Sequence, residues 1–126
     1  NALTLGMVRD LTAAYQAAVD DASVRCILLS GEGEKAFCAG GDVRAIWDVT
    51  REGGPGERME AAMADSFFRE EYALNMAIAG CPKPQVSVWH GFIMGGGAGI
   101  SVHGAYRVAT ERAAFAMPET NIGLFP

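Results

Sequence analysis

The 126-residue sequence has few cysteines and histidines, and their spacing argues against two common frameworks of small proteins. Cys26, Cys38 and Cys81 are odd in number and form no C-x-x-C pair, and only His90 and His103 could join them as ligands. Disulfide scaffolds and structural zinc sites need paired cysteines or characteristic spacings of Cys and His. The sequence therefore predicts neither, and it favours a reducing compartment: the cytoplasm, or the mitochondrial matrix in a eukaryote.

Long apolar runs and blocks of one charge are also absent. No segment reaches the roughly 18 to 20 uninterrupted apolar residues of a membrane span, and no basic-then-apolar leader stands at the amino end. The net charge of −5 is spread along the chain, which argues against nucleic acid or a membrane as partner and against disorder. We expect a single domain over residues 1–126. We also expect it to be truncated at both ends, because the chain begins at "NALTLGMVRDL" without Met and stops at "IGLFP".

The spacing of apolar residues predicts alternating helices and strands. Helical periodicity predicts three helices, over 3–21, 43–47 (with Asp42 as its N-cap) and 57–79. Strand-like runs occupy 24–31, 84–91, 106–110 and 113–117. Residues 31–42 are interpreted as a loop because they are rich in glycine, residues 51–57 as a break, and the glycine triplet 95–97 as the start of a short helix. This order indicates the α/β class, with no internal repeat visible in the sequence.

Two glycine-rich turns, "AFCAGGD" at 36–42 and "MGGGAG" at 94–99, each follow an apolar run and precede a helix. Glycine lets the backbone approach a ligand and present its own N–H groups, and a helix N-terminus adds partial positive charge. Two such turns brought together predict an oxyanion hole, in which one donor contributes about 3 to 4 kcal/mol. Close packing or tight turning explains either turn alone more simply.

Two other chemistries have weaker support in the sequence. "GEGEKA", residues 31–36, matches the G-x-G-x-x-A dinucleotide fingerprint after a strand, but no helix is predicted to begin inside it, as nucleotide binding requires. Cys38 could be a nucleophile with His90 or His103 as its base, although cysteine is also a common buried apolar residue and nothing places a histidine beside it. Both histidines are expected to be structural, because their spacing matches no zinc signature.

Three glutamates are the candidate acids. Glu119 stands in the otherwise apolar stretch "MPETNIGLFP", where loss of hydration would favour use as a general acid or base; capping of a turn or exposure to solvent is the equal alternative. Glu70 and Glu71 follow "FFR" in the long predicted helix, and by default both belong to its solvated face.

Taken together and in this order, three segments resemble the crotonase (enoyl-CoA hydratase/isomerase) superfamily, and more closely its 3-hydroxyisobutyryl-CoA hydrolase branch: "KAFCAGGDVR", "FFREEYALN" and "KPQVSVWHGFIMGGGAGISVHGAYRVATERAAFAMPETNIGLFP". The similarity covers nearly the whole chain from Lys35 onward. It implies a spiral of repeated ββα units, the ClpP/crotonase fold, of which this chain holds the amino-terminal core portion. It also implies an acyl-CoA substrate and no separate cofactor or metal, since coenzyme A is part of the substrate.

The resemblance also assigns ligand contacts to the two glycine-rich turns. It places the two N–H donors for the thioester carbonyl at Ala39 and at Gly96, the middle glycine of the triplet. It further implies that the backbone of Ala39, Gly40, Gly41 and Asp42 contacts coenzyme A where the molecule bends and near its adenine.

For the acids, the resemblance implies that Glu71 and Glu119 contact the substrate and that a further catalytic Asp directly follows Pro126. One position departs from the hydratases, which carry a catalytic Glu two residues after the glycine triplet, where this chain has Gly99. Addition of water across a double bond uses two carboxylates, and glycine at position 99 removes one of them. This difference argues against hydration as the reaction.

These observations together predict hydrolysis of a small β-hydroxyacyl-CoA thioester, 3-hydroxyisobutyryl-CoA being the expected substrate, in valine breakdown. Glu119 would attack the carbonyl or activate a water that does so. An enoyl-CoA isomerase using the one carboxylate at Glu119 and a non-catalytic acyl-CoA-binding protein are the alternatives. Because the carboxyl-terminal part of family members often makes subunit contacts, a homo-oligomer is also an open expectation.

Overall fold

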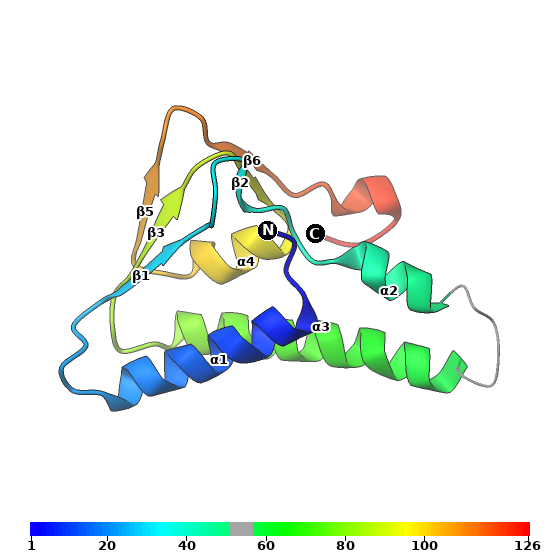
Figure 1. Cartoon of the computed structure of the whole chain (residues 1–126), viewed down its shortest axis with the longest axis horizontal. Coiled ribbons are helices and arrows are strands. Elements are labelled where there is room, and N and C mark those ends of the chain that lie inside the picture. Colours follow the sequence, from blue (N-terminus) through cyan, green and yellow to red (C-terminus); the bar gives the residue numbers. More distant parts are fainter. Residues whose placement is uncertain (51–56) are drawn as a thin grey trace.

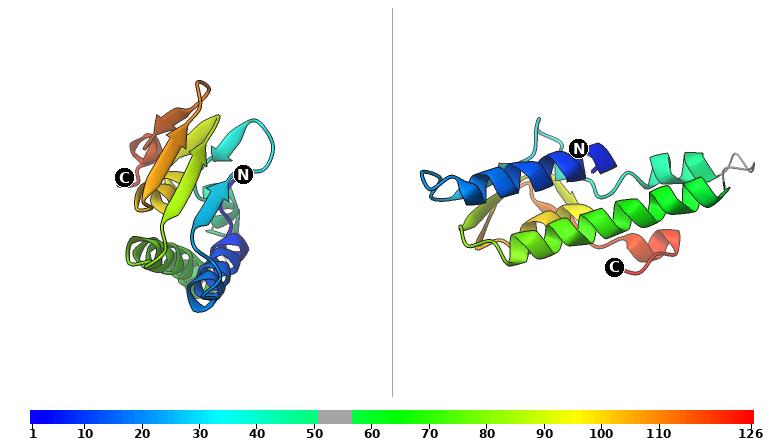
Figure 2. Two further views of the ribbon diagram at one scale, coloured as in Figure 1. Left: turned by 90° about the vertical axis from the view of Figure 1, so that its left-hand side faces the viewer. Right: turned by 90° about the horizontal axis from the view of Figure 1, so that it is seen from below.

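The structure is a computed structural model that describes residues 1–50 and 57–126, with α1 and α3 lying side by side beneath the strands (Figures 1 and 2). The elements in chain order are α1 (Leu5–Asp20), β1 (Ile27–Ser30), β2 (Ala36–Cys38), α2 (Val43–Thr50), α3 (Glu57–Ala79), β3 (Gln85–Trp89), β4 (Phe92–Met94), α4 (Gly96–Val102), β5 (Tyr106–Ala109), β6 (Ala114–Ala116) and the 3₁₀ helix η1 (Glu119–Ile122). Within these ranges no helix has the length and hydrophobicity of a membrane span.

The strands form two parallel sheets, with orders β1-β3-β5 and β2-β4-β6. Each strand of the first sheet is followed along the chain by a strand of the second, and a helical segment then leads on. Parallel neighbours require such crossover connections. The predicted spiral of ββα units is therefore confirmed, although the sequence shows no repeat. The ββα units have the same pattern of strand pairing but differ in amino-acid sequence.

Most of the predicted elements occur where the apolar periodicity places them. The three long helical segments, four strands and the helix opened by the glycine triplet are all present. Asp42 caps α2 as predicted, because its Oδ1 accepts a hydrogen bond from the Ala45 N–H at 3.1 Å. The predicted break at 51–57 lies outside the described residues except for Glu57, where α3 begins.

The interpretation of residues 31–42 as a loop is wrong for Ala36–Cys38, which form the buried strand β2. The predicted elements also omit β4. Each strand has three residues, too few for an alternating pattern to be recognised. Pairing explains why they form: β4 lies between β2 and β6 and bonds to both.

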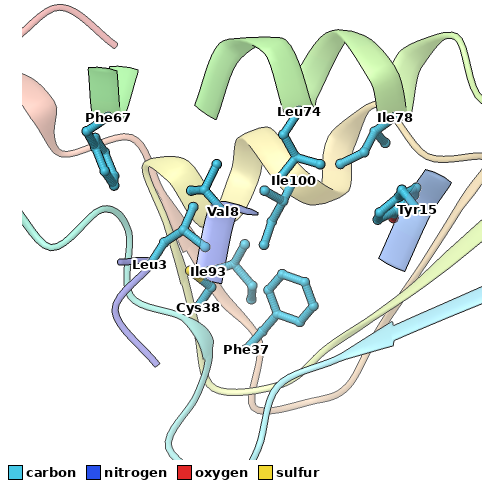
Figure 3. Close-up of a cluster of buried hydrophobic side chains, with 10 residues drawn as sticks. All are labelled: Leu3, Val8, Tyr15, Phe37, Cys38, Phe67, Leu74, Ile78, Ile93 and Ile100. Carbon is cyan, nitrogen blue, oxygen red and sulfur yellow. The ribbon is translucent and has the colours of Figure 1, made fainter. Parts of the chain in front are cut away.

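The buried apolar side chains meet between the helices and the sheets, as Figure 3 shows. One face of α3 contributes Phe67, Leu74 and Ile78, and the fourth buried residue at this spacing is the charged Glu71. A carboxylate is rarely placed on a core-facing stripe. The helix therefore carries one acidic group into the interior of the protein.

The glycine triplet lets α4 pack directly on β2. A Cβ atom on Gly97 would lie 2.6 Å from the carbonyl oxygen and 2.8 Å from the Cβ of Cys38. Backbone at that distance cannot move aside without disturbing the β2–β4 pairing. At the preceding position, Gly95 has φ 49°, which turns the chain from β4 into the helix.

The first prediction concerns this contact. Gly97→Ala should destabilise the protein by about 1 to 3 kcal/mol in equilibrium urea unfolding, because the added methyl overlaps Cys38. Gly6→Ala is the matched control: Gly6 lies in α1 with only the Thr4 hydroxyl oxygen near, at 3.8 Å from the added Cβ. That change should stabilise by up to about 1 kcal/mol through helix propensity. A stabilising effect of Gly97→Ala would contradict the packing argument.

Candidate active site

A cavity of about 550 Å³ lies where both glycine-rich turns face α3 and residues 117–126. Its volume is within the range of small-molecule sites, about 300 to 1,000 Å³. Residues of both turns, of α3 and of η1 are among those that line it: Ala39, Gly40, Gly41, Gly95, Gly96, Gly99, Phe67, Glu71, Asn75 and Glu119. Segments far apart in the sequence therefore share one pocket.

The two turns meet because β2 and β4 are neighbours in a parallel sheet, with Cys38 opposite Ile93. Parallel strands end at the same edge, so the turns that follow them emerge together. A Cβ on Gly40 would lie 3.1 Å from the Met94 carbonyl oxygen, and one on Gly96 would lie 3.4 Å from the Gly41 nitrogen. Glycine is needed at this junction for the two backbones to approach.

The Ala39 N–H, which is the predicted donor to the substrate carbonyl, is not available in the structure. The Ala39 N–H already donates to the Asn1 carbonyl at 2.9 Å, because residues 1–3 run beside this turn. In the same way the Asp42 N–H donates to the Leu3 carbonyl at 2.9 Å. Within the part of the chain that the structure describes, the intervening Gly41 N–H has no acceptor. The available donor of this turn is therefore Gly41, two residues beyond the predicted one.

The second turn leaves its predicted donor available. Gly96 is the first residue of α4, and the first N–H groups of a helix have no acceptor in the preceding turn. Gly95, by contrast, donates to the Ala116 carbonyl at 3.2 Å. Among the residues that the structure describes, neither the Gly96 nor the Gly41 N–H has an acceptor, so the two form a pair of donors at the wall of the cavity that can bind an anionic oxygen.

Glu71 is buried against this pair, with 6% of its surface exposed. Its Oε1 lies so close to Gly96 that any side chain there would overlap it. Burial raises the pKa of Glu71 above its ordinary value of 4.5, and the nearby charge of Glu119 raises it further. The default interpretation of Glu71 as a solvated residue is wrong. The stripe of Phe67, Leu74 and Ile78 on the same face of α3 is the signal that identifies it.

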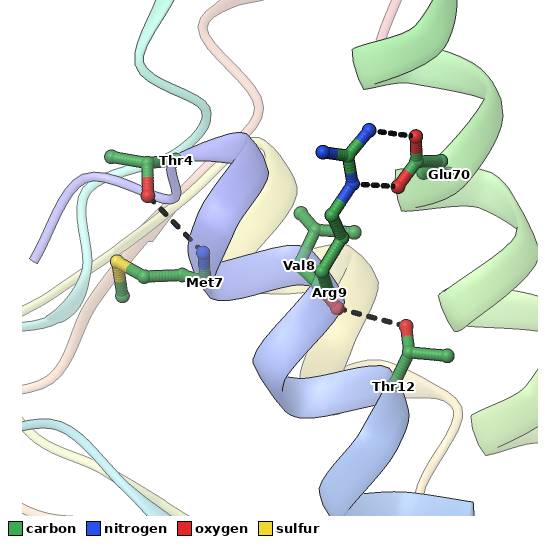
Figure 4. A network of polar contacts seen from close by, with 6 residues as sticks. All are labelled: Thr4, Met7, Val8, Arg9, Thr12 and Glu70. Carbon is green, nitrogen blue, oxygen red and sulfur yellow. Dashed lines mark hydrogen bonds and ion pairs between the residues drawn. The ribbon is translucent and has the colours of Figure 1, made fainter.

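Glu70 is the glutamate that faces outward. Arg9 on α1 donates to both of its carboxylate oxygens at 2.7 Å, and Figure 4 shows this pair bridging the two helices. The same view shows the start of α1, where the Thr4 hydroxyl accepts from the Met7 N–H at 3.2 Å. The Arg9–Glu70 ion pair therefore lies on the outer side of α3. The next residue, Glu71, points the other way, toward the cavity.

Glu119 reaches the cavity from the opposite side. It begins η1, and its carbonyl accepts from the Leu124 N–H at 3.0 Å after the left-handed Gly123. A Cβ on Gly95 would lie 2.6 Å from Glu119 Oε1. Its Oε2 is buried and has no hydrogen-bond partner in residues 1–50 and 57–126. The two carboxylates therefore face adjacent glycines of the triplet, Glu71 at Gly96 and Glu119 at Gly95.

The other candidate chemistries are not assembled. The Cys38 thiol donates to the Gly40 carbonyl at 4.0 Å, and burial raises its pKa, which opposes the reactive thiolate. His90 instead contacts the Gly33 carbonyl through Nε2 at 3.0 Å, and His103 ends α4. The dinucleotide fingerprint at 31–36 leads into β2 and not into a helix.

Comparison with known proteins shows the family to which the chain belongs. Residues 1–126 match a model of the enoyl-CoA hydratase/isomerase family along their whole length. The chain belongs to that family. Relatives named "3-hydroxyisobutyryl-CoA hydrolase, mitochondrial" are 50% identical in Bos taurus, 52% in Xenopus laevis and 50% in Homo sapiens. Each alignment covers 100% of this chain and 31% of the relative, so the chain spans about a third of their length.

Solved structures of the family share the fold. An enoyl-CoA hydratase from Rhodobacter sphaeroides 2.4.1 superposes with a TM-score of 0.89 at 39% identity. A carnitinyl-CoA dehydratase from Mycobacterium thermoresistibile also gives 0.89, at 43% identity. Both superpositions cover 99% of this chain and 35% of the other. The family fold is therefore shown for the amino-terminal part that the chain represents.

The raised pKa of Glu71 gives a prediction for stability against pH. Between the unfolded and the folded pKa the folded protein binds more protons, so stability declines as pH rises through that window. Glu71→Gln removes this charge. The variant should be more stable than the unaltered protein at about pH 8, and the difference should vanish by about pH 4. Urea unfolding at both pH values measures it.

Glu70→Gln is the matched control one residue away. The hydrogen bond from Arg9 lowers the pKa of Glu70, so this carboxylate contributes stability at neutral pH that is lost on acidification. Its substitution should therefore destabilise at about pH 8, opposite in sign to Glu71→Gln. If both substitutions changed the free energy of unfolding in the same direction at about pH 8, the buried charge could not be assigned to Glu71.

Proposed function

We propose that this chain carries the acyl-CoA site of a 3-hydroxyisobutyryl-CoA hydrolase, which converts 3-hydroxyisobutyryl-CoA and water into 3-hydroxyisobutyrate and free coenzyme A in valine breakdown. The observation that carries the proposal is the pair of unengaged N–H groups, on Gly41 and Gly96, with the Glu119 carboxylate beside them. The relatives at about 50% identity, named for this activity, support the choice of substrate.

Hydrolysis begins with the thioester carbonyl oxygen between the Gly41 and Gly96 N–H groups. Attack on the carbonyl carbon moves the π electrons onto that oxygen, and the two donors stabilise the resulting negative charge. Collapse of this intermediate breaks the C–S bond and releases coenzyme A as its thiolate. The donors act where charge develops, which is the condition for accelerating the reaction.

Glu119 supplies the attack in one of two ways. Its carboxylate adds to the carbonyl and forms a mixed anhydride that water then hydrolyses, or it takes a proton from a water that attacks directly. Glu71, which holds its proton to higher pH than a free glutamate, helps to orient the hydroxyl of the substrate or the other acids. The Asp expected directly after Pro126 completes the proposed set of acids.

The turn at 39–42 is proposed to receive the coenzyme A portion. Ala39, Gly40 and Gly41 line the cavity through their backbone, whereas the Asp42 carboxylate caps α2. Coenzyme A is the carrier of the substrate, and we propose no other cofactor and no metal. For the whole protein we propose the mitochondrial matrix in a eukaryote or the cytoplasm in a bacterium, and self-association as a homo-oligomer.

Two alternative functions use the same cavity. An enoyl-CoA isomerase needs one carboxylate to move a proton, and Glu119 fits that role. A 3-enoyl-CoA substrate distinguishes it, since isomerisation releases no coenzyme A. A non-catalytic acyl-CoA-binding protein would bind the substrate without turnover. The donor pair beside a carboxylate favours a catalytic function over mere binding, because binding alone does not need groups placed for a developing oxyanion.

The proposal predicts that Glu119→Gln in the whole protein lowers kcat/KM for 3-hydroxyisobutyryl-CoA by a factor on the order of 10² to 10⁴. The amide keeps the shape and removes the base or nucleophile. Release of coenzyme A, followed with a thiol reagent, measures the rate. Glu111→Gln is the control, because Glu111 is exposed in the turn after β5 and should keep the full rate. Full activity of Glu119→Gln would exclude the proposed role.

Rapid quenching of the active enzyme separates the two roles of Glu119. Nucleophilic attack leaves an acyl group on Glu119 during turnover, detected as a mass increase on the peptide that contains it. An activated water leaves no such adduct and places solvent oxygen directly in the acid product.

A further prediction tests which amides hold the carbonyl. A substrate analogue with methylene in place of the thioester sulfur keeps the carbonyl and cannot be hydrolysed. On its binding, the Gly41 and Gly96 amide proton resonances should move downfield in ¹H–¹⁵N spectra, because each gains a hydrogen bond. Ala39 should stay unchanged, since its N–H is engaged with Asn1. A downfield shift of Ala39 instead of Gly41 would restore the donor predicted from the sequence.

A further inference from the structure

Asn75 is a cavity residue that the proposed chemistry has not used. It lies on α3 four residues after Glu71, so the two side chains share a face of the helix. Both line the cavity. The Asn75 Oδ1 is buried and has no hydrogen-bond partner among the residues that the structure describes. A buried polar atom without a partner costs about 1 to 3 kcal/mol, so an apolar side chain would be more stable there.

Asn75 also occupies the space beside Gly99. A Cβ on Gly99 would lie 2.6 Å from Asn75 Nδ2 and 3.1 Å from its Oδ1. Gly99 is the position at which the hydratases carry a catalytic Glu. In this chain a neutral carboxamide from α3 takes the place of that acid.

The position of Asn75 relative to the donor pair fits the acyl group of the proposed substrate. Gly99 follows Gly96 by three residues on α4, and Asn75 follows Glu71 by four on α3, so both helices advance about one turn of ~5.4 Å. Glu71 adjoins Gly96 and Asn75 adjoins Gly99. A β-hydroxyl oxygen lies three bonds from the carbonyl carbon. With the carbonyl at Gly96, the hydroxyl is therefore within reach of Asn75.

A carboxamide suits a β-hydroxyacyl group for a chemical reason. A β-hydroxyacyl thioester can lose water when a base removes its α-proton and an acid protonates its hydroxyl. Asparagine binds the hydroxyl but has no proton to exchange near neutral pH. It holds the group without promoting this loss.

We infer that Asn75 determines the specificity of the site for a β-hydroxylated acyl group, its Oδ1 accepting a hydrogen bond from the β-hydroxyl. The inference rests on the proposed hydrolase function. An acyl group that lacks the hydroxyl leaves the buried oxygen unpaired, and a site built to bond a hydroxyl discriminates strongly against such an analogue.

The test compares two thioesters that differ only in the hydroxyl, 3-hydroxyisobutyryl-CoA and isobutyryl-CoA, with the whole protein. The unaltered enzyme should prefer the hydroxylated substrate in kcat/KM by a factor on the order of 10² or more. In Asn75→Leu this preference should fall to within about threefold. KM for the hydroxylated substrate should rise, while kcat/KM for isobutyryl-CoA is kept or improved. If Asn75 had a purely structural role, its substitution would lower kcat/KM for both substrates alike.

Two further variants keep the result interpretable. Asn75→Ala removes the carboxamide without adding bulk and should lose the preference in the same way, so it replaces Asn75→Leu if that variant fails to fold. Met76→Leu, with Met76 74% exposed on the same helix, should keep the preference. The inference is overturned if either folded Asn75 variant keeps the preference, or if kcat/KM falls equally for both substrates. The proposed function stands in either case. If the unaltered enzyme releases coenzyme A from neither thioester, the proposed function falls, and the inference with it.

Discussion

The parallel pairing of β2 with β4 is the interaction on which the rest of the site depends. Each strand has three residues, yet their alignment brings two glycine-rich turns from distant parts of the chain to one edge of a sheet. α4 can start there because Gly97 lets it rest directly on Cys38. A helix start and a turn with a free N–H then face the same cavity. The placement of the two amides therefore follows from backbone geometry before any side chain is considered.

The carboxylates are placed against this backbone pair at a cost in stability. Glu71 stands on the core face of α3, where burial disfavours its charged form and raises its pKa. Glu119 arrives from a separate segment and keeps an unpaired buried oxygen. An interior optimised for stability alone would hold neither group. Their convergence on adjacent glycines marks the region where this protein gives up stability for function.

Long elements could be predicted from the sequence, because many residues share one periodicity. α3 was expected over 57–79 and spans those residues. The three-residue strands β2 and β4 could not, since pairing with distant partners and not local pattern forms them. Residue type alone places Glu71 on a solvated face, which is wrong, whereas its spacing from Phe67 and Leu74 indicates the buried face. The sequence could not show that the Ala39 N–H is engaged, because contact with residues 1–3 decides which amide of this turn stays free.

The pairing of residues 1–3 with the turn at 39–42 has a consequence for how this site tolerates change. Main-chain atoms of Asn1 and Leu3 engage the Ala39 and Asp42 amides and so leave the Gly41 amide for the cavity. The side chains of this segment are held as well, because Leu3 is fully buried in the core and the Asn1 side-chain amide donates to the Glu32 and Ala36 carbonyls at 2.7 Å. A one-residue insertion or deletion there would shift the register and exchange the engaged and the open amides. Both the length and the composition of this segment are therefore constrained, because its carbonyls select the open amide while its side chains hold it in register.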